Sequence, residues 1–386
     1  MFGFGRTNWL SYHTAAKLLL EFFNMLFSKL SLLMALLSMH SHLLHAFPLN
    51  LNRVSRYMGT SPNIIKDLSK QSTALEVLRF LNAQKKLAPY VGADGVVVVT
   101  GGSNGIGAVS VETLALTGMK VVLCAQNVTK AQQVIDKFDD SIDKTSIRIQ
   151  RLDLNDLNSV RQAAEDISQF EGQIDVLLNN AGVMAIPSKE LTSQGFEKQL
   201  GINHIGHHYF TRKLLPSVKP NGRIVTVAST AHTMTKTLEI DDLNYDSRIY
   251  TGWDAYGQTK LANILFAKEL QDRLATEGSD IKSVSLHPGV IKTNLWRYTT
   301  GGNFFVDTLT TLLADRNTDQ GAATNVYCCL VNGSELQGGS YYIDCMEGYP
   351  NVNARDESRI LRRRLWKKTE ELLTEAGFGL NGSLLY

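Results

Sequence analysis

Short apolar runs alternate with longer amphipathic segments between residues 95 and 290, and this pattern predicts a parallel sheet. The runs are rich in Val, Ile and Leu and too short for helices, so we interpret them as buried strands. The predicted strands are Val96–Val99, Val121–Ala125, Ile147–Leu152, Ile174–Leu178, Arg223–Ala228 and Ser283–Leu286. Helical spacing follows at Ala108–Leu116, Glu197–Leu215 and Ala255–Glu269. This alternation predicts an α/β fold with one doubly wound parallel sheet and helices on both faces.

A glycine-rich loop joins the first predicted strand to the first predicted helix. Glycine there permits a tight turn and lets backbone N–H groups approach a pyrophosphate at the positive end of a helix. The loop therefore predicts a dinucleotide site. Its candidate residues are Thr100, Gly101, Ser103, Asn104, Gly105, Ile106 and Gly107.

The ends of the next strands supply further candidate cofactor contacts. Gln126 follows the second strand, where an acidic residue selects NAD and a basic one accepts the extra phosphate of NADP. Glutamine is neither. Asp153 ends the third strand and could accept a hydrogen bond from the adenine amino group, or could simply cap a helix. Asn180-Ala181-Gly182 follows the fourth strand, where small and amide residues suit a nearby ligand.

Tyr256 and Lys260 lie four residues apart in a strongly helical segment, so they share one helix face. An ammonium beside a phenol lowers the tyrosine pKa, and such a tyrosine can exchange a proton with an alcohol or carbonyl. Ser229, at the end of the fifth strand, could hold the substrate oxygen. Asn203 lies in the middle of a predicted helix, where asparagine is unfavourable unless its side chain has a functional role. These four residues are the catalytic candidates.

Taken together, these motifs resemble the short-chain dehydrogenase/reductase family over residues 93–345, which implies a Rossmann-type sheet. Within the family the chain is most similar to the retinol dehydrogenase and WW-domain oxidoreductase branch, including related plant proteins of the plastid envelope. The carrying stretches are Ile202–His207, Tyr256–Phe266 and His287–Thr293, with a fit also at Arg364-Leu365-Trp366. WW modules are absent, because no second tryptophan follows Trp9 before Trp253.

The resemblance implies a role for each candidate. Tyr256 would be the general acid/base, Lys260 its pKa tuner and a ribose ligand, and Ser229 the group that orients the substrate oxygen. Asn203 would hold a water that relays protons to Lys260, and Thr293 would contact the nicotinamide carboxamide. The implied cofactor contacts also include Leu154, Pro288 and Gly289. The resemblance favours NADP(H) as the cofactor. This branch usually carries an arginine where the chain has Gln126, so NAD(H) is also possible.

Charge and composition separate the first 90 residues from the rest. They carry 10 Lys and Arg against 3 Asp and Glu, a net charge of +7, while the remainder carries 29 against 34, a net of −5. A basic leader on an acidic enzyme suggests targeting or membrane contact, and not nucleic-acid binding. The four cysteines form neither a metal spacing nor a disulfide framework, so no metal is expected.

Residues 1–52 are expected to be a signal, targeting or membrane-anchor leader. Leu30–Asn52 contains no Lys, Arg, Asp or Glu, but its apolar centre, Leu30–Leu37, is short for a membrane span. Met25 offers a second start. The leader resembles either an anchor for the endoplasmic reticulum membrane or a signal and transit segment for a plastid, and the cytosol is not expected. We expect a helical linker at 53–92 and a C-terminal helical extension at 346–386, with a helix at Arg355–Glu375.

Two functions remain open from the sequence. The first is an NAD(P)(H)-dependent oxidoreductase that interconverts an alcohol and a carbonyl on a lipophilic substrate, such as a retinoid, steroid or isoprenoid. The alternative is a membrane-associated dinucleotide-binding redox sensor or scaffold with little turnover. The intact catalytic set favours the first. A homodimer is possible.

Overall fold

Eight strands form one sheet in the part of the chain that the computed structural model describes, residues 67–92, 94–140, 142–235, 237–291 and 316–380. The strands are β1 Val96–Thr100, β2 Lys120–Ala125, β3 Ile147–Arg151, β4 Ile174–Asn179, β5 Val218–Val227, β6 Lys282–His287, β7 Tyr341–Ile343 and β8 Met346–Gly348. Their spatial order is β3-β2-β1-β4-β5-β6-β7-β8. All neighbours are parallel except β7 and β8, which pair antiparallel.

The order of the strands reverses between β1 and β4, and ligands of doubly wound sheets bind at such a switch point. β2 and β3 lie on one side of β1, while β4, β5 and β6 extend the sheet on the other side. The first four residues of β1 are valines, and all five of its residues are buried, as expected for a strand covered on both faces. The predicted fold class is confirmed, and all six predicted strands are present.

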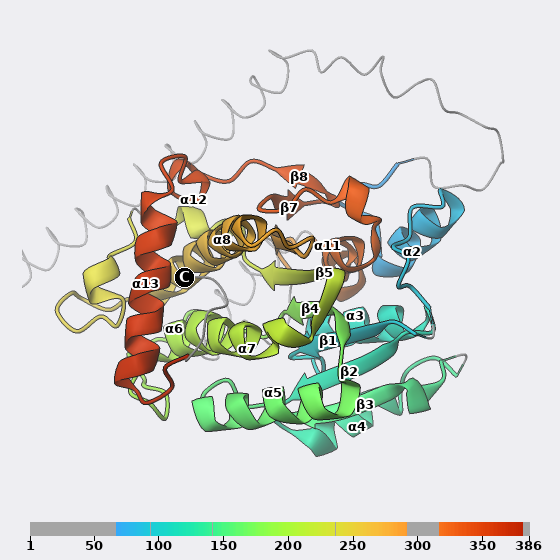
Figure 1. The fold of residues 1–386 in the computed structure, drawn as a ribbon, viewed down its shortest axis with the longest axis horizontal. Coiled ribbons are helices and arrows are strands. Elements are labelled where there is room, and N and C mark those ends of the chain that lie inside the picture. Colours follow the sequence, from blue (N-terminus) through green and yellow to red (C-terminus); the bar gives the residue numbers. More distant parts are fainter. Residues whose placement is uncertain (1–66, 93, 141, 236, 292–315, 381–386) are drawn as a thin grey trace, which may run out of the picture. The chain divides into compact units, whose positions relative to one another are not determined.

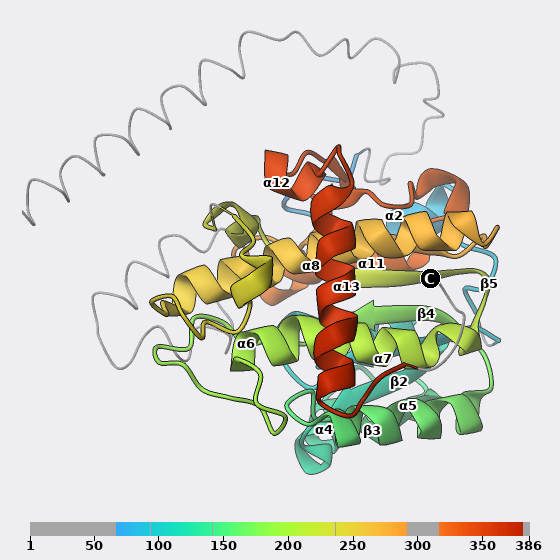
Figure 2. The ribbon, with the colours of Figure 1, turned by 60° about the vertical axis from the view of Figure 1, so that its left-hand side comes forward.

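Helices cover both faces of the sheet (Figures 1 and 2). One face carries α3 Gly105–Ala115, α4 Val128–Ile135 and α11 Thr318–Leu330. The other carries α5 Leu157–Glu171, α7 Gly206–Leu214 and α8 Gly252–Thr276. On that second face, α13 Ile360–Glu375 crosses α7 and α8. Trp366 of α13 stacks on Phe266 of α8, with the ring centroids 5.8 Å apart. Two short helices of the described residues are α6 Lys198–Leu200 and α12 Val352–Arg355.

The sequence pattern did not indicate every element. The hairpin of β7 and β8 comprises strands of three residues each, too short to give a periodicity of their own. The helix expected at Glu197–Leu215 is interrupted by a π-helical turn at Gly201–Ile205, between α6 and α7. Among the described residues, no helix is long and apolar enough to cross a bilayer. The leader lies outside the described residues.

Helix α2, Ala74–Ala83, precedes the sheet and packs as part of the core. A capping box between Thr73 and Glu76 fixes its start. Val77 and Leu81 are fully buried among the residues of α3 and α11. The segment that we expected to link the leader to the domain therefore contributes apolar contacts to the face of the sheet that carries α3.

We expect Leu81→Ala to lower the free energy of unfolding by about 2–5 kcal/mol, because it leaves a cavity between α2 and α11. Urea denaturation followed by circular dichroism measures this effect. Leu75→Ala is the matched control on the same helix, since Leu75 is 37% exposed, and its cost should stay below about 1 kcal/mol. Equal losses for the two variants would show that α2 does not anchor the core through Leu81.

Candidate active site

The glycine-rich loop lies at the carboxyl end of β1 and leads directly into α3. Gly101 has a φ of +67°, and a β-carbon there would lie 2.9 Å from the Ala181 Cα atom. A β-carbon on Gly107 would lie 2.3 Å from the carbonyl oxygen of Gly101. Both positions therefore require glycine. Asn104 caps α3 without a side-chain cap bond, and the first turn offers backbone N–H groups to an anion.

Thr100 ties this loop to the segment that follows β4. Its Oγ1 accepts hydrogen bonds from the backbone nitrogens of Asn180 at 2.8 Å and Ala181 at 3.0 Å. The Asn180 side chain donates in return to the Thr100 carbonyl oxygen at 2.9 Å. The two predicted cofactor segments therefore meet at the switch point of the sheet, as the parallel arrangement of β1 and β4 requires.

A second group of polar residues lies where the adenosine end of a dinucleotide would be expected. Gln126 Nε2 donates to Asp153 Oδ2 at 2.9 Å, and Asp153 Oδ1 accepts from the Asn155 backbone at 2.9 Å. Lys130 Nζ lies 2.6 Å from Asn104 Oδ1. Lys130 is a cation beside the glycine-rich loop, on the first turn of α4, and the sequence reasoning did not single it out.

The catalytic candidates on α8 and β5 lie together. Tyr256 and Lys260 are both buried on one face of α8. Ser229, which follows β5, lies close enough to Tyr256 for its hydroxyl to act on the pKa of the phenol. Lys260 Nζ donates to the Val227 carbonyl oxygen at 3.0 Å. A β-carbon on Gly182 would lie 3.7 Å from the same Nζ atom, so Lys260 faces the segment after β4.

Burial decides the protonation of this pair. It raises the pKa of the Tyr256 phenol above its usual value, while the hydrogen bond from Ser229 acts in the opposite direction. Burial lowers the pKa of Lys260 to about 8. The ammonium lies 5.5 Å from the centroid of the Tyr256 ring. The lowered tyrosine pKa that the sequence suggested is therefore wrong for this arrangement, because burial outweighs the effect of the Ser229 hydroxyl.

Asn203 lies in the π-helical turn and is fully buried. Its amide nitrogen donates to the Val183 carbonyl oxygen at 2.9 Å and to Thr259 Oγ1 at 3.0 Å. Its amide oxygen accepts from the Val183 backbone at 2.8 Å. Both N–H groups of the side chain are thus used inside the protein, and the amide fixes the segment after β4 against α8.

The remaining predicted cofactor residues lie after β3 and after β6. Leu154 follows β3 in the chain and is buried. Gly289, after Pro288, has a φ of +99°, and a β-carbon there would lie 2.4 Å from Arg316 Cδ, so this turn also requires glycine. Thr293 lies outside the described residues.

Sequence reasoning missed two further polar residues that the fold brings to this site. Thr259 Oγ1 donates to the Tyr256 carbonyl oxygen at 2.8 Å and accepts from Asn203. His207 lies between Thr100 and Asn203. Its position four residues after Asn203, on the same helical face, was the available signal. The partner at Thr100 is 107 residues away, and no local pattern indicates it.

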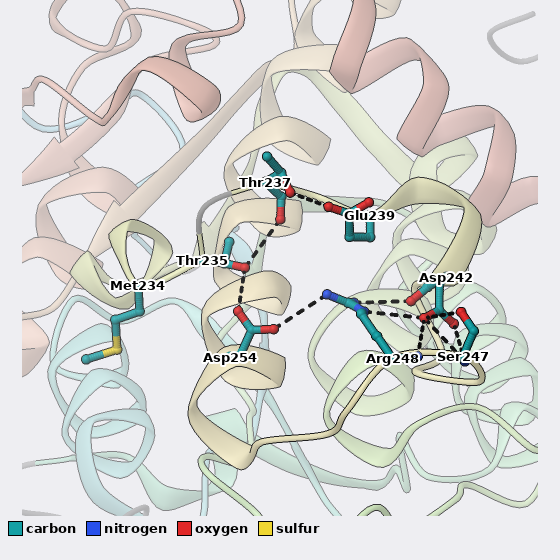
Figure 3. Close-up of a pocket in the computed structure, with 8 residues that line it drawn as sticks. All are labelled: Met234, Thr235, Thr237, Glu239, Asp242, Ser247, Arg248 and Asp254. Atoms are coloured by element: carbon teal, nitrogen blue, oxygen red, sulfur yellow. Dashed lines mark hydrogen bonds and ion pairs between the residues drawn. The ribbon is translucent and has the colours of Figure 1, made fainter. Parts of the chain in front are cut away.

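A pocket of about 520 Å³ opens over the start of α8 (Figure 3). Its lining consists of Met234, Thr235, Thr237, Glu239, Asp242, Ser247, Arg248 and Asp254. Arg248 bridges Asp242 and Asp254, each at 3.5 Å. None of the catalytic candidates lines this pocket, and its two aspartates already bind the guanidinium. This pocket is therefore separate from the predicted catalytic residues.

Comparison with known proteins agrees with this geometry. The family model described as short chain dehydrogenase matches residues 95–302. Human retinol dehydrogenase 11 is 35% identical, over 72% of this chain and 85% of that protein. Human polyprenol dehydrogenase is 33% identical with the same coverage. The chloroplastic short-chain dehydrogenase TIC 32 B of Brassica napus is 34% identical, over 76% of this chain and 91% of that protein.

A crystal structure of an uncharacterized protein from Mycobacterium paratuberculosis is also similar. It is 32% identical, with a TM-score of 0.60, over 75% of this chain and 96% of that one. The family model spans the glycine-rich loop, β5 and the Tyr256 helix, so its match includes the whole candidate site. The chain therefore belongs to the short-chain dehydrogenase/reductase family, in its retinol dehydrogenase-like branch, and is an NAD(P)-dependent alcohol/carbonyl oxidoreductase.

Proposed function

We propose that the protein interconverts an alcohol and a carbonyl on a lipophilic substrate, with Tyr256 as the general acid/base. The observation that carries this proposal is the position of Ser229 beside the buried Tyr256 phenol, with Lys260 one helical turn away on the same helix. A carbonyl oxygen placed between the two hydroxyls would receive a hydrogen bond from each. The glycine-rich loop and the segment after β4 would hold the dinucleotide, which supplies or accepts the hydride when bound.

Each residue then has one task in carbonyl reduction. Ser229 orients the substrate oxygen, and Tyr256 donates its proton to that oxygen. A buried phenol with a raised pKa is protonated at neutral pH, which is the form that reduction requires. Lys260 contributes a nearby positive charge that stabilises the phenolate left behind. Asn203 holds α8 and the segment after β4 in register.

Apolar side chains near Tyr256 support a lipophilic substrate. Met184, Ala185 and Ala231 pack with the Tyr256 ring in a small buried cluster. Trp253 lies edge-on to the same ring, with the centroids 6.3 Å apart, and is 39% exposed. The names of the retinol and polyprenol dehydrogenases point to substrates of the same kind. Retinoids and isoprenoids are therefore the proposed class, ahead of polar sugars or acids.

The test is turnover on a series of straight-chain and isoprenoid aldehydes, followed by the absorbance of NADPH or NADH. We expect kcat/KM to rise by about fourfold for each added buried methylene group, since each is worth about 0.8 kcal/mol. Glyceraldehyde serves as the polar control of similar reactivity. A flat series, or a preference for glyceraldehyde, would contradict the proposed substrate class.

We further propose that the enzyme prefers NADP(H), with Lys130 acting near the 2′-phosphate in place of the arginine expected at Gln126. Lys130→Met should lower the ratio of kcat/KM for NADP to that for NAD by about tenfold, because one exposed charged hydrogen bond is lost. Gln126→Arg should raise the ratio. Lys137→Met, an exposed lysine just beyond α4, is the control. A wild-type ratio that favours NAD, or no change with Lys130→Met, would rule out this assignment.

The leader supports a location at the endoplasmic reticulum membrane or in a plastid. Its net positive charge and uncharged stretch favour membrane contact, and one relative carries the description chloroplastic. Membrane association and a homodimer remain predictions from the sequence.

A further inference from the structure

A buried histidine connects the predicted cofactor loop to Asn203. His207 lies in the first turn of α7 and is 2% exposed. Its Nε2 atom lies 2.9 Å from Thr100 Oγ1. Its Nδ1 atom lies 3.1 Å from the Asn203 carbonyl oxygen. This imidazole therefore contacts both halves of the site.

The direction of every hydrogen bond in this chain follows from its two ends. The Asn203 carbonyl can only accept, so His207 Nδ1 carries the proton and donates. In a neutral imidazole the other nitrogen then accepts, so the Thr100 hydroxyl donates to His207 Nε2. Two lone pairs remain on Thr100 Oγ1, and the backbone N–H groups of Asn180 and Ala181 occupy them. Each of these groups is satisfied, and the imidazole must be neutral.

The environment of His207 fits that state. Burial lowers the pKa of the imidazole to about 4, and the charge of Lys260 acts in the same direction. A second proton on Nε2 would face the Thr100 hydroxyl at 2.9 Å, whose lone pairs are already taken. Thr100 would then have to donate to the Leu178 carbonyl at 3.5 Å, which is a weak contact.

The link continues beyond Asn203 to the catalytic helix. The Asn203 amide bonds Val183 and Thr259, and Thr259 bonds the Tyr256 carbonyl oxygen. One run of hydrogen bonds therefore joins the residue before the glycine-rich loop to the backbone of the proton-transferring tyrosine. Satisfied buried networks of this kind hold one arrangement of the groups they connect.

We propose that His207 is a positioning residue that sets Asn203 and the catalytic helix in register with the cofactor loop. This role rests on the proposed function, because it presumes that Asn203 and Tyr256 take part in catalysis. His207 acts through Thr100 and Asn203 and does not touch the reacting atoms. Loss of its two hydrogen bonds should therefore lower kcat as well as cofactor affinity.

Three variants separate polarity from packing. His207→Phe keeps a ring but removes both nitrogens. His207→Gln keeps one donor and one acceptor, both bonded to one carbon as Nδ1 and Nε2 are in the imidazole, and does not titrate. His204→Phe is the matched control, because His204 is equally buried on the same helical segment but bonds Thr369 of α13 at 3.0 Å.

The experiment measures NADPH affinity by fluorescence titration and kcat at saturating cofactor on one lipophilic aldehyde, with folding checked by circular dichroism. We expect His207→Phe to lose about tenfold or more in both quantities, since it leaves buried polar groups unpaired. His207→Gln should recover both to within about threefold, and His204→Phe should match the wild type in both. A folded His207→Phe with both values near wild type overturns the proposal, as does a Gln variant as impaired as the Phe variant.

Should His207→Phe fail to fold, the same link can be cut at its other end. Thr100→Val removes the hydroxyl, and Thr100→Ser retains it. A loss of kcat at saturating cofactor in the Val variant, but not in the Ser variant, supports the link. A loss of cofactor affinity with no loss of kcat overturns it. If the wild type turns over no carbonyl, the proposed function fails, but the effect of His207→Phe on NADPH affinity still tests the contact with the cofactor loop.

Discussion

Replacing Tyr256 with phenylalanine is expected to abolish turnover and leave cofactor affinity unchanged. The variant removes one hydroxyl, and that hydroxyl is the only group in the proposed mechanism that transfers a proton to the substrate oxygen. General acid/base groups contribute about 10²–10⁴-fold to rate, so kcat should fall by this factor. The ring, which packs with Met184, Ala185 and Ala231, stays in place. Steady-state turnover on an aldehyde, alongside NADPH titration, measures the two effects separately.

Tyr209→Phe is the control for this experiment. Tyr209 is a buried tyrosine on α7 whose ring packs against Phe378, away from Ser229. Its loss of a hydroxyl should change neither kcat nor affinity. Activity of Tyr256→Phe within a few fold of the wild type would end the proposed mechanism. It would also favour the alternative of a cofactor-binding protein with little turnover, if the wild type is itself slow.

Lys260→Ala is expected to damage both catalysis and cofactor affinity, because the ammonium has two tasks. We expect kcat to fall by about 10²-fold as the phenolate loses its stabilising charge. Affinity should fall by about tenfold through loss of a charged hydrogen bond to the ribose. Lys260→Arg should not restore either value, since a planar guanidinium does not replace a compact charge bonded to the Val227 carbonyl.

The pH dependence gives a second measurement of the same residue. The pKa of Lys260 is lowered to about 8, so its charge is present at pH 7 and lost as the pH rises through about 8. The kcat of reduction in the wild type should therefore decline on the alkaline side near pH 8. Lys268→Ala, on the same helix, should retain this decline. An alanine variant at position 260 that binds cofactor normally and only shifts the profile would exclude the ribose role.

The strands and the glycine-rich loop could be predicted because their signals are local. Val96–Val99 is a run of valines, which is typical of a strand buried on both faces. Gly101 and Gly107 follow it at the spacing that a tight turn before a helix requires. Tyr256 and Lys260 lie one helical turn apart wherever the helix is placed. In each case the spacing along the chain already contains the geometry.

The protonation of the site could not be predicted in this way. The sequence places a lysine four residues after Tyr256, which suggests a lowered phenol pKa. The sign of the shift, however, depends on how completely the ring is removed from water. Tyr256 is 5% exposed, and this burial raises its pKa. Burial is a property of the packed chain, and no spacing rule gives it.

The sequence by itself determined the fold class, the dinucleotide loop and the four catalytic candidates, because periodicity and motif spacing act within a few residues. Only the tertiary structure placed Lys130 beside Asn104, packed α2 into the core and set His207 between Thr100 and Asn203. The polar contacts form because parallel strands bring their carboxyl ends to one edge of the sheet, whereas α2 packs against α3 and α11 on one of its faces. Which polar groups meet at that edge depends on the packing of every element between them.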